Sequence, residues 1–75
     1  MLDAVKLDKL DNKILEALVI GNLTAKDIHE CVNQDMKTPR SVIFSRLIRL
    51  VELEYVNIVH SVDQGVEKTE FYIKV

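Results

Sequence analysis

The stretch PRSVIFSRLIRLVELE, residues 39–54, has the strongest helical periodicity in this chain of 75 residues. At about 100° per residue, its apolar residues Ile43, Leu47 and Leu50 fall together at the centre of one face. The preceding residue, Thr38, offers a hydroxyl to cap the helix, and proline is favoured in a first helical turn. The pattern therefore predicts an amphipathic helix with one face buried and the other exposed.

The exposed face of this helix has the chemistry of a DNA-reading surface. Ser41 and Ser45 are small hydroxyl residues on that face. Arg49 follows one turn later, and Arg40 stands at the start of the helix. Small polar side chains allow a helix to lie deep in the major groove, and arginine reaches guanine O6 and N7 or a phosphate. Any solvated amphipathic helix also presents a polar face. Three observations favour the DNA-reading interpretation: the absence of acids from residues 36–51, the short helix and tight polar turn before this helix, and the hairpin directly after it.

Positive charge is concentrated at this helix. Residues 36–51 carry one lysine, three arginines and no acid. Residues 1–35 carry four lysines against seven acids, and residues 52–75 carry two lysines against five acids. The formal net charge of −2 by itself argues against DNA binding. A basic block between acidic segments, however, focuses positive potential on one element, and that favours contact with phosphate.

Two shorter helices are expected before the long one. The first covers about residues 8–20, with Asp8 as its N-cap and Asp11 placed favourably for the helix dipole. The second covers about residues 25–33 and begins after Thr24, in a fair version of a capping box.

Beyond Tyr55 the sequence changes to the period of a β-strand. Strand-forming residues fill the range of about 56–75 on both sides of the turn signal Asp63-Gln64-Gly65. A β-hairpin is therefore expected here, with a further short strand at Leu23. The predicted class is α+β, with three helices followed by a C-terminal hairpin, in one domain that covers residues 1–75.

Three stretches resemble known DNA-binding regulators. LDKLDNKIL at residues 7–15 resembles the opening of the leucine-responsive regulator family. SVIFSRLIRL at 41–50, followed by Glu54-Tyr55-Val56, looks like the recognition helix of winged-helix repressors, and KTEFYI at 68–73 is similar to their second wing strand. The resemblance implies a winged helix-turn-helix domain, with the third helix in the major groove and the hairpin wing near the adjacent minor groove or backbone.

The resemblance also implies individual contacts, from Arg40, Ser41, Ser45 and Arg49 on the helix and from Gln64 and Lys68 on the wing. With the rest of the basic block, the candidate DNA-binding residues are Lys37, Thr38, Arg40, Ser41, Ser45, Arg46, Arg49, Gln64 and Lys68. Two features depart from the repressor pattern: Phe44 replaces a usually polar residue, and the wing is acidic or neutral where many wings are rich in arginine. The effector domain of leucine-responsive regulators does not follow the hairpin, so no small-molecule effector is expected.

No catalytic site, metal site or cofactor is expected. His29 and Cys31 lie two residues apart, but a structural zinc site usually has four ligands and the chain has one cysteine. A core cysteine and surface histidines are the simpler interpretation. Neither a nucleophile motif nor a phosphate-binding loop occurs, so the chain is expected not to be an enzyme.

Surplus apolar residues indicate a partner surface. Four of them exceed what so small a core requires, a two-fold homodimer is the commonest solution, and the first helix is the expected interface. The predicted dimer interface comprises Leu2, Val5, Leu15 and Val19. A second apolar stripe, formed by Phe44, Ile48 and Val51, is expected to pack under the wing.

The leading hypothesis is a cytoplasmic transcriptional regulator, a homodimeric repressor that binds double-stranded DNA sequence-specifically through helix 39–54. No apolar run approaches the roughly 18 residues of a membrane span, so no membrane partner is expected. The alternative hypothesis is a winged-helix adaptor that binds another protein, which the acidic composition and Phe44 also suit. Salt dependence separates the two, because phosphate binding releases counterions.

Overall fold

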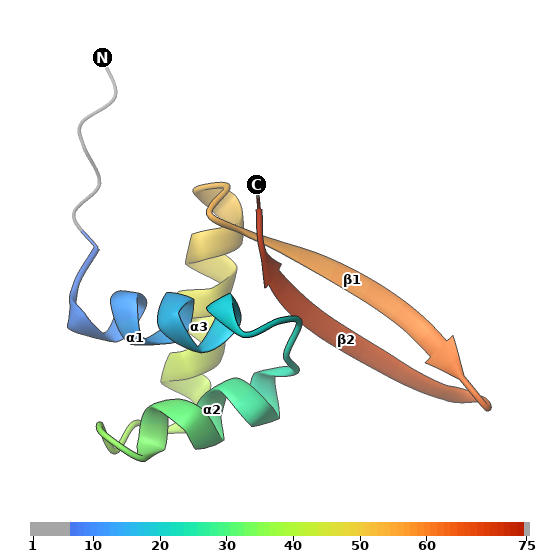
Figure 1. The fold of residues 1–75 in the computed structure, drawn as a ribbon, viewed down its shortest axis with the longest axis horizontal. Helices are drawn as coiled ribbons and strands as arrows, with labels where there is room; N and C mark the ends of the chain where they lie inside the picture. Colours follow the sequence, from blue (N-terminus) through green and yellow to red (C-terminus); the bar gives the residue numbers. More distant parts are fainter. Residues whose placement is uncertain (1–6, 75) are drawn as a thin grey trace.

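Three helices are followed by a two-stranded antiparallel hairpin in the computed structural model, which describes residues 7–74 (Figure 1). The helices are α1 (Lys9–Val19), α2 (Ala25–Asn33) and α3 (Arg40–Glu52). The strands are β1 (Val56–Asp63) and β2 (Val66–Ile73). The hairpin projects away from the three helices, and its turn is the part farthest from them (Figure 1). The predicted α+β class and order of elements are confirmed.

The start of α1 is fixed by a reciprocal capping box. The backbone N–H of Asp11 donates to Asp8 Oδ1 at 2.9 Å, and the backbone N–H of Asp8 donates to Asp11 Oδ2 at 3.2 Å. Backbone donors that a helix start leaves without partners are thus satisfied. The prediction that Asp8 caps this helix is confirmed.

The starts of α2 and α3 differ in how they are capped. Thr24 Oγ1 accepts a hydrogen bond from the N–H of Asp27 at 3.2 Å, as the sequence predicted for α2. The predicted hydroxyl cap of α3 is wrong. Thr38 Oγ1 donates instead to the carbonyl of Met36 at 3.1 Å, and Pro39 occupies the N-cap position. Thr38 lies one residue too early, since an N-cap side chain must reach the N–H two or three residues on.

The end of α3 is a Schellman turn. The N–H of Tyr55 donates to the carbonyl of Leu50, and the N–H of Glu54 donates to the carbonyl of Val51, both at 3.0 Å. Glu54 has a φ of +66°, in the left-handed region that favours glycine. This turn carries the chain from α3 directly into β1.

The wing is a regular hairpin that pairs along its whole length. Gln64 and Gly65 form its two-residue turn, and both have positive φ, at 52° and 79°. Two successive positive φ values are the mark of a type I′ turn, whose twist matches that of the paired strands.

Leu23 adds a third short segment at the edge of β2. Its N–H donates to the carbonyl of Phe71 at 3.0 Å, and the N–H of Phe71 donates to the carbonyl of Leu23 at 2.7 Å. The predicted extra strand is therefore present as a single bridge. This bridge fastens the α1–α2 connection to the base of the wing.

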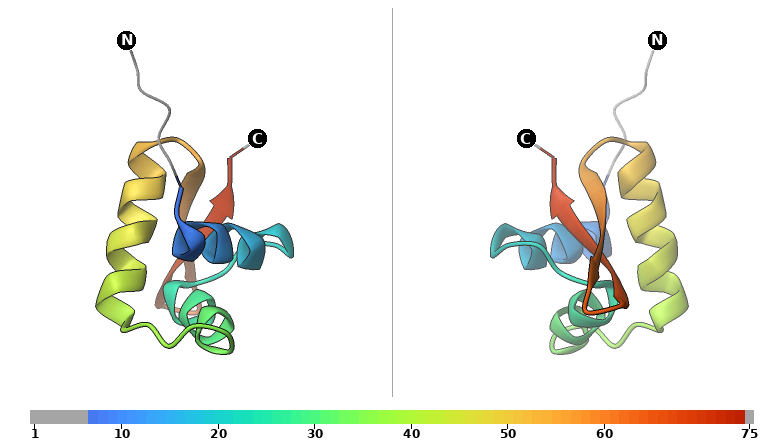
Figure 2. Two further views of the ribbon diagram at one scale, coloured as in Figure 1. Left: turned by 90° about the vertical axis from the view of Figure 1, so that its left-hand side faces the viewer. Right: turned by 90° about the vertical axis from the view of Figure 1, so that its right-hand side faces the viewer.

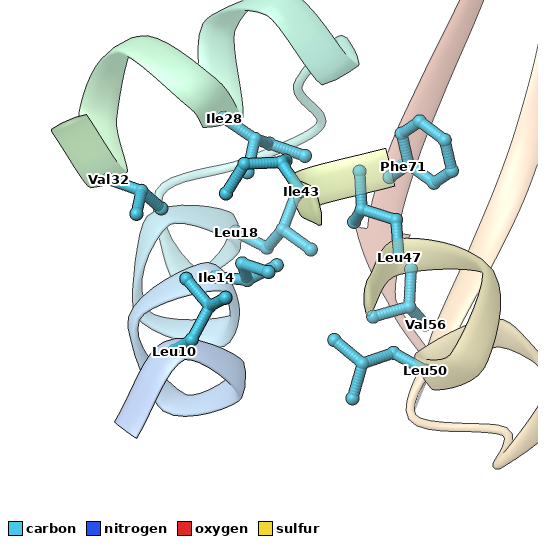
Figure 3. Close-up of a cluster of buried hydrophobic side chains, with 10 residues drawn as sticks. All are labelled: Leu10, Ile14, Leu18, Ile28, Val32, Ile43, Leu47, Leu50, Val56 and Phe71. Atoms are coloured by element: carbon cyan, nitrogen blue, oxygen red, sulfur yellow. The ribbon is translucent and has the colours of Figure 1, made fainter. Parts of the chain in front are cut away.

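One hydrophobic core joins the helices to the base of the hairpin (Figure 3). The three helices supply most of its side chains, and each strand supplies one. Its buried members are Leu10, Ile14, Leu18, Ile28, Val32, Ile43, Leu47, Leu50, Val56 and Phe71. Burial of Ile43, Leu47 and Leu50 confirms the apolar face predicted for α3. The core is the main source of stability, since no disulfide is possible in a chain with one cysteine.

Two sequence-based expectations about apolar residues are wrong. Phe44 and Ile48 do not pack under the wing, because 52% of Phe44 and 38% of Ile48 remain exposed. The hairpin contacts the core at its base and then projects away from the three helices (Figure 1). Val51, the third member of that stripe, does pack against the core. Cys31 is half-buried and not a core residue.

Candidate nucleic-acid interface

A short, hydrogen-bonded turn joins α2 to α3 and sets where α3 begins. His29 Nε2 donates to the carbonyl of Thr38 at 2.9 Å, so this nitrogen carries the hydrogen. The N–H of Thr38 donates to Asn33 Oδ1 at 2.8 Å. Both side chains come from α2, and both bonds end on the residue just before the N-cap of α3. The two helices are thereby held as one helix-turn-helix unit.

The α3 helix stands along one outer side of the domain (Figure 2). Its first two turns expose Arg40, Ser41 and Ser45, and Lys37 is exposed in the turn before it. Within residues 7–74, neither Lys37 nor Arg40 forms an ion pair. No described side chain caps the helix, so its first N–H groups also face outward from this end. The arrangement offers an anion two charges and a helix N-terminus together.

Two other arginines of the basic block are held by acids of α1. Arg46 Nη1 donates to the Asp8 carboxylate and, at 3.3 Å, to Asp11 Oδ1. Arg49 Nη1 lies 3.5 Å from Asp11 Oδ2. The Arg46 guanidinium, together with the backbone N–H of Asp11, lowers the pKa of Asp8 to about 2. The pKa of Arg46 is raised in turn, chiefly by its hydrogen bond to Asp8.

These ion pairs give Arg46 and Arg49 a role within the fold that sequence reasoning missed. Their partners precede them by more than 30 residues, so no local spacing reveals the pairing. The sequence predicts Asp8 and Asp11 at the start of α1, but only as residues that stabilise the start of this helix. Contact between either arginine and DNA stays a prediction.

The two predicted wing residues lie apart from α3. Gln64 is exposed in the hairpin turn, and Lys68 is exposed on β2. Lys68 Nζ lies 3.6 Å from Glu70 Oε2, which neutralises part of its charge. Asp63 and Glu67 stand beside them, so acids outnumber bases on the wing. Electrostatic attraction of the wing to phosphate is correspondingly weak.

The predicted dimer residues of α1 lie on a groove between α1 and the base of the hairpin. Val19 is 73% exposed and lines this groove with Leu15 and Tyr55. Leu15 also packs against the core, so it is only partly available. The other two predicted residues, Leu2 and Val5, lie outside the described residues.

A metal site needs several ligating side chains close together. No three His, Cys, Asp or Glu side chains of residues 7–74 lie together as a metal site requires. His29 is engaged with Thr38, and His60 Nδ1 lies 2.9 Å from Thr69 Oγ1. None of the described helices combines the length and apolar character needed to cross a membrane.

The helix-turn-helix pair, the bridge at Leu23 and the two-stranded wing together define the winged helix-turn-helix fold. Solved structures share this fold at low sequence identity. PadR of Bacillus subtilis, solved in complex with operator DNA, superposes with a TM-score of 0.75 and is 21% identical. YodB of B. subtilis, solved after diamide treatment, gives 0.77 at 18% identity, and a transcriptional regulator of Clostridium thermocellum gives 0.76 at 17%.

The aligned regions cover most of this chain but only part of each neighbour. They span 87%, 89% and 87% of this chain and 40%, 62% and 65% of the PadR, YodB and Clostridium chains, respectively. No model of a protein family matches the sequence, and none of the curated proteins does. The comparisons therefore establish the fold.

Proposed function

We propose that this protein binds double-stranded DNA and acts as a sequence-specific transcriptional regulator, with α3 in the major groove. The observation that carries the proposal is the exposed start of α3. Lys37 and Arg40 have no ion-pair partner among residues 7–74, and they stand beside an uncapped helix end and two small serines. Such an end suits a phosphate, and the serines allow the helix to approach base edges closely.

The four basic residues of the block have different proposed roles. Lys37 and Arg40 supply the direct contacts to phosphate and bases. Arg46 and Arg49 pair with Asp8 and Asp11, which neutralise part of their charge, so these two arginines contribute less than Lys37 and Arg40 to the attraction of phosphate. The wing supplies little affinity, because Lys68 is surrounded by acids.

The fold comparison supports the proposal without deciding it. One structure of this fold, PadR, has been solved with operator DNA, and another is a transcriptional regulator. A common fold can serve unrelated functions, so the function must rest on the site itself. No group in the candidate interface points to catalysis, and a role as a non-enzymatic binding protein is part of the proposal.

A homodimer through α1 is the proposed assembly. Val19 at the end of α1 and its C-cap Ile20 are highly exposed large apolar residues, and the groove beside Val19 continues to Tyr55 of the α3–β1 turn. Pairing of two such surfaces would remove apolar area from water. In a two-fold dimer the two α3 helices would read half-sites about 34 Å apart.

The experiment that tests DNA binding is fluorescence anisotropy with random-sequence duplex DNA over about 50 to 200 mM salt. Two or three phosphate contacts predict that affinity falls about 10- to 40-fold over this range. Failure to bind at about 50 mM salt would exclude the proposed function.

One observation favours a second candidate, an adaptor that binds another protein. Phe44 exposes about half of its surface on α3, and exposed aromatic side chains are common anchors of protein interfaces. An apolar protein interface responds weakly to salt, so the same titration with a candidate protein partner separates the two functions.

A further inference from the structure

The outward face of α3 combines small polar and large apolar side chains. On a helical wheel at about 100° per residue, Phe44, Ile48, Ser41 and Ser45 follow one another over an arc of about 100°. The centre of the buried face, at Ile43, Leu47 and Leu50, lies on the other side of the helix. The exposed fractions agree with the wheel, since all four residues are exposed, as is Glu52, which falls in the same arc in the last turn of α3. We call Ser41, Phe44, Ser45 and Ile48 the outward arc.

The outward arc lacks the groups that usually read guanine. Arg46 lies on a different flank of α3, where Asp8 and Asp11 hold it. Arg49 is next to Ser45 on the wheel, and its Nη1 lies 3.5 Å from Asp11 Oδ2. Only Arg40, at the helix start, remains as an unpaired guanidinium of α3 among the described residues. The side chains that face outward from the middle of the helix are therefore hydroxyls, an aromatic ring and an aliphatic chain.

Base edges in the major groove offer one apolar group to such a surface. The C5 methyl of thymine projects into the groove, and apolar side chains contact it, whereas hydroxyls bond to either purine or pyrimidine edges. Cytosine, adenine and guanine present no methyl there. A helix that places Phe44 and Ile48 in the groove thus gains from burying thymine methyls and loses hydration when it meets only polar edges.

Resting on the proposed function, we propose that α3 reads thymine methyl groups, with Phe44 and Ile48 as the specificity-determining residues and Ser41 and Ser45 allowing the close approach. The preferred target is duplex DNA with thymines in the major groove opposite the middle of α3. The basic residues Lys37 and Arg40 at the helix start give charge complementarity to DNA, which favours this occupant over an apolar protein segment.

Duplexes that differ only in the C5 methyl test the proposal. Competition binding would compare alternating dA-dT duplex with alternating dA-dU duplex at one low salt concentration. The two duplexes have the same charge and the same hydrogen-bonding groups, so the contribution of phosphate contacts to the affinity is the same for both. Burial of one or two methyls predicts that the dU duplex binds about 4- to 15-fold more weakly. A second pair of duplexes, alternating dI-dC with cytosine or with 5-methylcytosine, tests the same effect by adding a methyl. The duplex with 5-methylcytosine should bind more tightly.

The variants Phe44→Ala and Ile48→Ala assign the effect to residues. Each should reduce the methyl dependence while leaving the fold intact, because both side chains are partly exposed. Val62→Ala is the matched control, since Val62 is an exposed apolar residue of the wing, and it should keep the full dependence.

The outcomes are distinct. Equal binding of the dT and dU duplexes by a protein that does bind DNA overturns the methyl-reading inference and leaves the proposed function standing. An unchanged methyl dependence in both α3 variants also overturns it. Absence of binding to every duplex overturns the proposed function itself.

Discussion

The buried carboxylate of Asp11 accepts a hydrogen bond from the Arg46 guanidinium at 3.3 Å, and this contact joins the start of α1 to the middle of α3. The same carboxylate closes the capping box by accepting the N–H of Asp8. Asp11 is the one fully buried charged side chain among the described residues. A buried charge needs partners, and α3 supplies them. The orientation of the candidate recognition helix is thus coupled to the N-terminal cap of α1.

Arg46→Ala should lower the free energy of unfolding by about 1–3 kcal/mol, because it leaves a buried carboxylate short of its best partner. Urea denaturation measures the change. Arg40→Ala is the matched control. Arg40 lies exposed on the same helix without an ion pair among residues 7–74, and its loss should change stability by about 0.5 kcal/mol or less. Equal effects of the two substitutions would contradict a structural role for Arg46.

Stability should fall in acid as Asp8 is protonated. Its pKa is lowered from 3.8 to about 2 in the folded protein, first by the hydrogen bond from Arg46. A lowered folded-state pKa contributes stability above the unfolded value, and this contribution is lost as pH falls from about 4 to about 2. Asp8→Asn keeps a capping side chain but removes the charge. The free energy of unfolding of this variant should therefore change less between about pH 4 and about pH 2 than that of the native protein. Because Asp8 is half exposed, the difference should be about 0.5–1 kcal/mol in low salt. Parallel pH curves for the two proteins would refute this.

Glu54→Gly should stabilise the protein by about 0.5 kcal/mol. Glu54 holds a φ of +66° at the end of α3, a conformation that costs a non-glycine residue about 1 kcal/mol. The substitution also removes the exposed Glu54–Lys74 ion pair, which is worth little. Glu54→Ala loses the ion pair and keeps the strained backbone, so it should not stabilise. Thermal denaturation of the three proteins checks the order.

The double substitution Lys37→Ala with Arg40→Ala should weaken binding to random duplex DNA about tenfold or more. The slope of log affinity against log salt should fall by about 2, one for each lost phosphate contact. Lys13→Ala, on α1, removes a lysine that is already engaged with Asp35, and it should leave the slope unchanged. Equal slopes for the double variant and the native protein would remove these two residues from the interface.

Val19→Asp should abolish or strongly weaken the proposed dimer. An unpaired carboxylate at the centre of an apolar interface is costly to desolvate, and about a tenfold or greater rise in the dimer dissociation constant is expected. Sedimentation equilibrium measures it directly. Val62→Asp, on the wing, carries the same change at another exposed valine and should not affect assembly. A native protein that sediments as a monomer at all concentrations would rule the dimer out.

The sequence alone determined the local structure of this protein. Helical period predicted all three helices, and capping residues predicted the starts of α1 and α2, because i, i+4 contacts and capping bonds are formed between near neighbours in the chain. The change of period after Tyr55 and the Gln64-Gly65 turn predicted the hairpin for the same reason. The buried face at Ile43, Leu47 and Leu50 followed from periodicity as well.

Only the tertiary structure decided which surfaces remain free. Arg46 and Arg49 belong to the basic block in sequence, but distant acids of α1 hold them in the fold. Phe44 and Ile48 form an apolar stripe by periodicity, but only the tertiary structure shows that they stay exposed. Which charged groups pair, and which apolar side chains are buried, depends on how elements far apart in the chain pack together. The sequence therefore located the candidate interface on α3, while packing decided which of its side chains are available to DNA.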